Sequence, residues 1–174
     1  MEYTKNKIPK NIQEFIDKLK EYIDTKIYYY GSIQRYDYFI SKSDIDFCIF
    51  TDNVDSMIHK TSNYLHINKK KFHKVIWTSR EKLIEGYKVN YNYNHDFRLE
   101  ITIYDEKYKK YVLEEQNATL TMPFYMVILL ILLKILYYSL QIIPTSYYVY
   151  YKRFIFEYMK GWNTNFTYIK GTTI

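Results

Sequence analysis

The chain is short of several residue types, and each shortage excludes a class of protein. Its 174 residues include one cysteine, Cys48, which excludes an internal disulfide and a cysteine-rich zinc site. Because Cys48 lies in an apolar run, we expect a buried, unreactive thiol. The four histidines show neither an HExxH motif nor a short paired spacing, so a histidine-based metal site is not expected. With only four glycines present, the position of each one is informative.

Apolar and basic residues are abundant instead. Hydrophobic residues make up 48% of the chain, enough to bury a core, and 23 tyrosines supply most of its aromatic content. The net charge of +6 favours anionic partners such as nucleotides, nucleic acid or an acidic membrane surface. This charge is spread along the chain. Its one dense run, residues 69–71, is expected to be a solvated loop, with phosphate binding as the alternative.

The spacing of apolar residues predicts an α+β domain over residues 1–118. Helices are expected at residues 8–23 and 54–67, with a short helical turn at 80–84. Strands are expected at residues 26–30, 45–50, 72–77, 87–93 and 97–104, the last two pairing antiparallel across a turn at 94–96. This order predicts a mixed sheet flanked by helices.

Residues 119–174 differ in character, since they combine a hydrophobic helix with an amphipathic, aromatic-basic tail. The hydrophobic stretch begins with Phe124, ends with Ile143 and carries Lys134 as its only charge. As a helix it would reach about 30 Å, the thickness of a bilayer core. We therefore predict a transmembrane helix that tethers the domain to the cytoplasmic face of a membrane. The alternative is a helix that packs within the protein or on a helical protein partner, because Lys134, Tyr138 and Gln141 form one polar stripe.

Two aspartates stand out at the start of the strand expected at residues 45–50. At a spacing of two, Asp44 and Asp46 point to the same face of a strand, while Ile45 and Phe47 point to the other. Carboxylates this close repel each other, and a divalent cation such as Mg²⁺ would offset the repulsion. Without further residues, a pair of solvated aspartates at the mouth of the strand is the better explanation of the pattern.

Gly31 and Ser32 add the features of a phosphate site. A glycine directly after a strand lets the backbone turn sharply or approach a ligand closely. A helix that begins near Ile33 would turn its free N–H groups toward a phosphate, and Ser32 would add a hydroxyl. The two residues together therefore predict a nucleotide-binding turn.

The segment GSIQRYDYFISKSDID, residues 31–46, resembles the hallmark of the polymerase-β-type nucleotidyltransferase superfamily. That hallmark is a GS pair, a spacer of roughly ten residues and S-D-x-D on a strand. Here the spacer is about one residue longer than the commonest form, and Tyr36 stands where small members often have glycine. The resemblance implies a nucleotidyltransferase-like fold over the first domain. It also implies nucleotide-binding roles for Gly31, Ser32, Arg35 and Ser43.

The same resemblance implies a third carboxylate on a later strand, completing a metal site with Asp44 and Asp46. The best candidate is Glu100, which shares a polar strand face with Arg98 and Thr102. Asp96 and Asp105 are its rivals, and both are more typical of loops. The three acids would bind Mg²⁺ or Mn²⁺ and act as the catalytic residues.

The implied activity is metal-dependent transfer of a nucleoside monophosphate from an NTP, with ATP as the expected donor, to a hydroxyl acceptor, with release of pyrophosphate. The acceptor is a nucleic acid, a protein or a small molecule. The small size of the chain suggests an alternative, a non-catalytic nucleotide- or partner-binding module that is tethered to a membrane.

Overall fold

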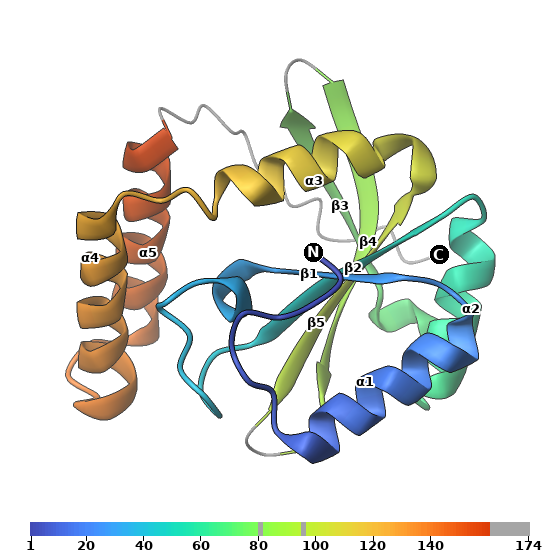
Figure 1. The fold of residues 1–174 in the computed structure, drawn as a ribbon, viewed down its shortest axis with the longest axis horizontal. Coiled ribbons are helices and arrows are strands. Elements are labelled where there is room, and N and C mark those ends of the chain that lie inside the picture. Colours follow the sequence, from blue (N-terminus) through green and yellow to red (C-terminus); the bar gives the residue numbers. More distant parts are fainter. Residues whose placement is uncertain (80–81, 95–96, 161–174) are drawn as a thin grey trace.

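The computed structural model describes residues 1–79, 82–94 and 97–160, and its two long N-terminal helices follow the predicted pattern (Figure 1). Helix α1, Lys10–Ile23, buries one apolar stripe that includes Ile12, Ile16 and Leu19. Helix α2, Val54–Tyr64, begins where the Asn53 side chain accepts a hydrogen bond from the backbone N–H of Ser56. The amphipathic spacing therefore identified both helices correctly.

A five-stranded mixed sheet forms the centre of the molecule, in the order β1-β2-β5-β4-β3. Strands β2 and β5 run parallel, and every other neighbouring pair is antiparallel. The strands are β1 Ile27–Tyr30, β2 Ile45–Thr51, β3 His73–Ser79, β4 Lys82–Asn92 and β5 Arg98–Asp105. The α+β class and the mixed sheet are thus confirmed.

The short helical turn expected at residues 80–84 is wrong in the part that the structure describes. Residues 82–84 belong to β4, whose first residue, Lys82, pairs with Ser79 of β3. Leu83 is exposed and Ile84 is fully buried, which is the alternation of a strand. Arg80 lies outside the described residues.

The two faces of the sheet are covered differently. On one face, alternate residues of β2 and β5 pack with α1 and α2 into a large apolar core, which contains Ile45, Phe47, Ile49, Leu99, Ile101 and Ile103. On the other face, Cys48 and Phe50 join a smaller cluster with Val112 of helix α3, Lys109–Ala118. The second cluster covers only part of its face, so room remains beside it for polar groups.

The C-terminal hydrophobic segment is a helical hairpin rather than one long helix. Helix α4, Phe124–Lys134, is followed by a π-helical turn, Ile135–Ser139, and the backbone reverses before α5, Thr145–Lys160. The two helices stand side by side at one end of the sheet (Figure 1). The predicted transmembrane helix is therefore wrong, since no helix among the described residues is long and apolar enough to cross a membrane.

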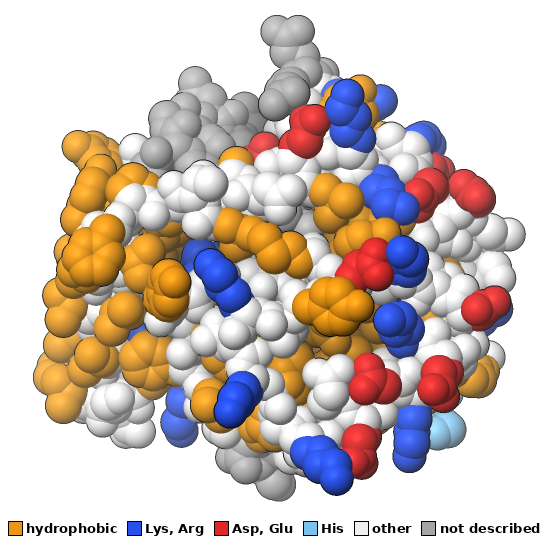
Figure 2. Space-filling model, in the orientation of Figure 1, with side chains coloured by type: hydrophobic (Ala, Val, Ile, Leu, Met, Phe, Trp, Pro, Cys, Tyr) orange, Lys and Arg blue, Asp and Glu red, His pale blue; other side chains and the backbone are white. Residues whose placement is uncertain are grey.

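Many side chains of the hairpin are exposed and apolar, and they gather over α4 and α5 in Figure 2. Phe124 and Leu132 are examples on α4, and Tyr150 and Phe154 on α5. Lys134 differs from these side chains in both respects, because it is charged and buried. Its direction, inward toward the sheet domain, shows how the hairpin is attached.

Candidate active site

Strand register places Asp46 and Glu100 side by side. The two residues are direct partners across the parallel pair β2 and β5, and Tyr30 of β1 is the partner of Asp46 on its other side. Asp44 immediately precedes β2 and lies 3.8 Å from the Arg98 guanidinium, measured from Oδ1 to Nη1. The three predicted acids thus lie at the same end of the two central strands.

Asp46 and Asp44 occupy an environment that opposes negative charge. Burial raises the pKa of Asp46 well above its ordinary value, and the neighbouring Glu100 and Asp44 raise it further. Burial also raises the pKa of Asp44, with Arg98 acting in the opposite direction. A cation bound between these carboxylates would remove the repulsion that the fold maintains here.

Glu100 already has two partners. The Tyr30 hydroxyl donates a hydrogen bond to Oε1 at 3.0 Å, and the Lys88 ammonium forms an ion pair with Oε2 at 2.5 Å. Burial raises the pKa of Tyr30 well above 10, so this hydroxyl stays protonated and remains a donor at neutral pH. Glu100 is therefore fixed in orientation by β1 on one side and β4 on the other.

Gly31 allows the first strand to end against Asp46. Its φ of +73° lies in the region that favours glycine. A Cβ built on Gly31 would lie 2.0 Å from the Asp46 Oδ2 atom, which is too close for any other residue without displacement. The turn after Gly31 is a short 3₁₀ helix, Gly31–Gln34, and not the longer helix expected near Ile33. Gly31 thus serves the placement of the carboxylate.

Asp44, Asp46 and Glu100 line a polar cavity of about 260 Å³. Acids and lysines share its wall with hydroxyl groups from the turn and the hairpin. The lining residues are Ser32, Ser43, Asp44, Asp46, Lys88, Glu100, Lys134, Tyr138, Tyr148 and Lys152. Three carboxylates and three ammonium groups therefore converge on one site.

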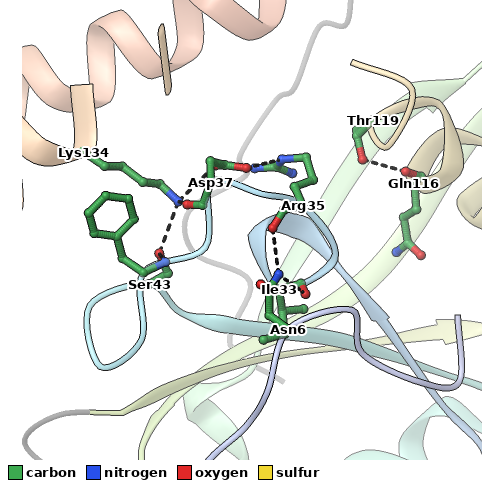
Figure 3. A network of polar contacts seen from close by, with 9 residues as sticks. Asn6, Ile33, Arg35, Asp37, Ser43, Gln116, Thr119 and Lys134 are labelled. Atoms are coloured by element: carbon green, nitrogen blue, oxygen red, sulfur yellow. Dashed lines mark hydrogen bonds and ion pairs between the residues drawn. The ribbon is translucent and has the colours of Figure 1, made fainter. Parts of the chain in front are cut away.

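A buried ion network ties the helical hairpin to the loop that precedes Asp44 (Figure 3). Lys134 of α4 forms an ion pair with Asp37 at 3.0 Å and donates hydrogen bonds to the Asp37 backbone carbonyl and the Ser43 hydroxyl. Arg35 meets the other side of the Asp37 carboxylate through two hydrogen bonds, at 2.7 and 3.1 Å. These contacts fix the loop between the turn at Gly31 and Ser32, called the GS turn below, and β2.

The network contains one carboxylate and two cations. Burial alone would raise the pKa of Asp37, but the hydrogen bonds and charges of Arg35 and Lys134 lower it below its ordinary value. Burial lowers the pKa of Lys134, and Asp37 partly offsets that effect. One carboxylate between two cations leaves a net positive charge beside the polar cavity, which suits an anionic ligand.

The predicted nucleotide-binding residues divide into two groups. Ser32 and Ser43 line the polar cavity, whereas Arg35 points into the buried network and contributes to a neighbouring apolar cavity. Ser43 accepts hydrogen bonds from Lys134 and from the backbone N–H of Phe39, so it also fixes the loop. Contact of Arg35 with phosphate therefore stays a prediction, while its ion pair with Asp37 is observed.

Of the two rival third acids, Asp105 does not join the site. Asp105 ends β5 at the opposite end from Glu100, where it accepts a hydrogen bond from the backbone N–H of Lys107. Asp96 lies outside the described residues. Cys48 is fully buried as expected, and burial raises the pKa of its thiol to about 12.

The donor atoms present fit a divalent cation only in part. Carboxylate oxygens are the ligands that Mg²⁺ and Mn²⁺ prefer, and Asp44 and Asp46 supply four of them to the cavity. Yet in residues 1–79, 82–94 and 97–160 no group of three His, Cys, Asp or Glu side chains is placed to hold a metal ion. Asp44 and Asp46 fit the cation better than Glu100, whose oxygens are engaged by Tyr30 and Lys88.

Several residues that hold the acids or line the cavity were not among the predicted site residues. Lys88 and Tyr30 hold Glu100, and Lys134 and Lys152 reach the cavity from the hairpin. The sequence contains one signal for Lys134, namely the polar stripe that it forms with Tyr138. That stripe meets the cavity, although a helix had been expected as its partner.

Comparisons with solved structures return RNA-modifying enzymes. One is described as Cid1 with RNA terminal uridylyl transferase activity, at 18% identity over 54% of this chain and 30% of that one, with a TM-score of 0.32. Another is a cytoplasmic RNA terminal U-transferase, at 16% identity over 56% and 32%, with a TM-score of 0.29. A third, a Cid1 poly(U) polymerase, is 15% identical over 62% and 34%, with a TM-score of 0.32. The chain thus matches about a third of the length of these proteins.

No match was found among curated proteins. A family model described as "Nucleotidyltransferase domain" matches residues 10–118, more than half of the chain. That range runs from α1 to the end of α3, and it contains the GS turn and all three acids of the polar cavity. The chain therefore belongs to the nucleotidyltransferase domain family.

Proposed function

We propose that the chain transfers a nucleoside monophosphate from an NTP to a hydroxyl acceptor and releases pyrophosphate. The observation that carries this proposal is the polar cavity, where Asp44, Asp46 and Glu100 converge with three lysines at the edge of the GS turn. Membership of the nucleotidyltransferase domain family supports the same class of reaction. We take ATP as the first donor to be tested.

In the proposed step the acceptor oxygen forms a bond to the α-phosphorus while the bond from that phosphorus to the bridging oxygen breaks. Pyrophosphate leaves with the bonding electrons, and the hydroxyl proton passes to a carboxylate of the cavity. Lys88, Lys134 and Lys152 are placed to attract the polyphosphate, and Ser32 to donate a hydrogen bond to it. Positioning and charge stabilisation are the main contributions in phosphoryl transfer.

A divalent cation, Mg²⁺ or Mn²⁺, held by Asp44, Asp46 and Glu100 would neutralise phosphate charge and lower the pKa of the attacking hydroxyl. Without a cation, burial raises the pKa of Asp46, and the negative charges of Glu100 and Asp44 raise it further. The strand register that makes Asp46 and Glu100 neighbours is what supports this assignment. Lys88 and Tyr30 orient the Glu100 carboxylate toward the same cavity.

The test is pyrophosphate release from ATP with MgCl₂ or MnCl₂, supplied with oligo(A) RNA, oligo(U) RNA or the protein alone as acceptor. We expect release that EDTA abolishes and that falls at least about 10³-fold in Asp46→Asn, since a cation supplies several kcal/mol of charge stabilisation. Asp52→Asn is the matched control, because Asp52 is an exposed aspartate beyond the far end of the same strand. Undiminished release by a folded Asp46→Asn variant would reject the mechanism.

A second function is favoured by one observation, namely that both oxygens of Glu100 are already engaged. If the ion pair between Lys88 and Glu100 persists when a nucleotide binds, the chain is a module that binds a nucleotide without turnover. Titration calorimetry with ATP distinguishes the two functions, because binding with no pyrophosphate released, under every acceptor tested, identifies the module.

A further inference from the structure

A second cavity adjoins the polar one on the same face of the sheet. It has a volume of about 370 Å³ and lies between the sheet, α3 and α5. Lys88, Glu100 and Lys152 line both cavities, so the two share a wall. The two cavities are therefore neighbours, separated only by these three side chains.

The wall of this second cavity is largely aromatic and aliphatic. Val75 and Trp77 contribute from β3, Tyr104 from β5, Val112 from α3 and Phe156 from α5. All these side chains are buried or half-buried, so the walls are packed against the protein behind them. Aromatic walls of this kind favour flat rings, which stack on them or meet them edge to face.

A few polar groups interrupt the apolar lining. Thr119 and Gln116 lie at the C-terminal end of α3, where the Thr119 hydroxyl donates a hydrogen bond to the Gln116 backbone carbonyl at 2.6 Å. The Gln116 side-chain amide lies beside the Cys48 sulfur, at 3.4 Å. Apolar walls with a small number of fixed polar groups are typical of small-molecule sites, and 370 Å³ falls in their usual range of roughly 300 to 1,000 Å³.

We propose that this cavity binds the base of a nucleotide whose phosphate lies at Lys88 and Lys152. A nucleotide has one flat, weakly polar part and one anionic part, which matches the two adjoining cavities. The choice of a nucleotide rests on the proposed function, but the base site itself does not require turnover. The base belongs either to the donor NTP or to the terminal nucleotide of an acceptor.

Trp77 provides a direct reporter, because the chain has two tryptophans, Trp77 and Trp162. In the full-length Trp162→Phe protein, Trp77 fluorescence is titrated with AMP, UMP and ribose 5-phosphate in EDTA. We expect AMP and UMP to change the emission saturably and ribose 5-phosphate, which has the phosphate without a base, to leave it unchanged. An equal response to ribose 5-phosphate would overturn the proposal.

Thr119→Phe tests the location by filling the cavity, and it should raise the Kd for AMP at least tenfold. Thr121→Phe is the matched control, since Thr121 is an exposed threonine whose hydroxyl likewise donates to a backbone carbonyl three residues earlier. We expect its Kd to stay within twofold. If Thr119→Phe does not fold, Phe156→Ala removes a ring from the wall and should weaken AMP binding severalfold. Unchanged binding in the folded variants would overturn the proposal.

Competition identifies the source of the base. Saturation with a non-hydrolysable ATP analogue that abolishes AMP binding assigns the cavity to the donor, and unchanged AMP affinity assigns it to the acceptor. Failure of this inference is distinguishable from failure of the proposed function. If Thr119→Phe leaves AMP binding unchanged while pyrophosphate release still depends on Asp46, only the base site is rejected. If Thr119→Phe weakens AMP binding while pyrophosphate release does not depend on Asp46, only the transfer is rejected.

Discussion

The two faces of the sheet use neighbouring residues for opposite purposes. On β2, Ile45, Phe47 and Ile49 point into the core under α1 and α2, where each is fully buried. Asp46 lies between two of them and points to the other face, into a polar cavity. The five-residue stretch 45–49 thus contributes both to the apolar core and to the charged cavity.

The difference between these faces lies in what covers them. Two long amphipathic helices, α1 and α2, cover the core face. The other face is covered by α3 at one end and by the hairpin at the other, and charged side chains fill the space between. Stability is therefore expected to depend mainly on the closed face, and ligand binding on the open one.

The largest expected effect on stability comes from Phe47→Ala on the closed face. Removing a fully buried phenyl ring should lower the free energy of unfolding by about 3 to 5 kcal/mol, as measured by urea denaturation. Asp46→Asn, one position away, should change it by less than about 1 kcal/mol, because burial disfavours the charged carboxylate. If both variants lost the same free energy of unfolding, stability would not depend mainly on the closed face.

Asp37→Asn should follow, with a loss of about 3 kcal/mol, because Arg35 and Lys134 would remain buried without a counter-charge. The pKa of Asp37 is lowered in the folded protein, so the stability that it supplies is present above its unfolded pKa of about 3.9 and is lost as the pH falls through the lower folded value. The difference between wild type and variant should therefore shrink below about pH 4. A difference that stayed constant in acid would show that the charge of Asp37 is not responsible.

Gly31→Ala should cost about 1 to 3 kcal/mol through backbone strain at positive φ and displacement of Asp46. This substitution tests the open face of the sheet, because Gly31 and the Asp46 carboxylate both lie there. In an Asp46→Ala background the contact disappears, so the added cost of Gly31→Ala should be smaller there. Denaturation of the four proteins of this double-mutant cycle measures the coupling, and zero coupling would remove the assigned role of Gly31.

Tyr30→Phe should have the smallest effect, about 1 kcal/mol, from loss of the hydrogen bond to Glu100. The pKa of Tyr30 is raised in the folded protein, so its contribution is complete below the unfolded value of about 10 and declines as the pH rises toward the folded one. Tyr22→Phe is the control, since Tyr22 is half exposed on α1. Losses of the same size in both variants would argue against a specific bond to Glu100.

Patterns among residues that are close in the sequence predicted most of the helices and strands. The period of apolar residues identified α1, α2 and most of the sheet, and the spacing of Asp44 and Asp46 predicted that both would face one site. The third acid, Glu100, followed from alternation along β5 and from the resemblance to a known family. Helix α3 was missed, because Val112 is its only fully buried residue and its apolar stripe is weak.

Contacts between distant parts of the chain could not be predicted. Lys134 reaches Asp37 across 97 residues, so hydropathy scored it as an isolated charge in a hydrophobic run. The same run was long enough for a bilayer by count, yet its helix ends at the π-helical turn Ile135–Ser139, and Gln141 follows with a positive φ. Arg35 matched its motif position, but Asp37, two residues later, engages its guanidinium.

The buried lysine of α4 has a consequence for how the protein is divided. Composition places a boundary near residue 118, and a shortened protein ending there would keep the whole sheet. It would lose the ammonium group that supports the segment from Asp37 to Ser43, and with it the rigidity of the approach to Asp44. We therefore expect the shortest version of this chain that folds to be shorter than the shortest version with a fully supported site.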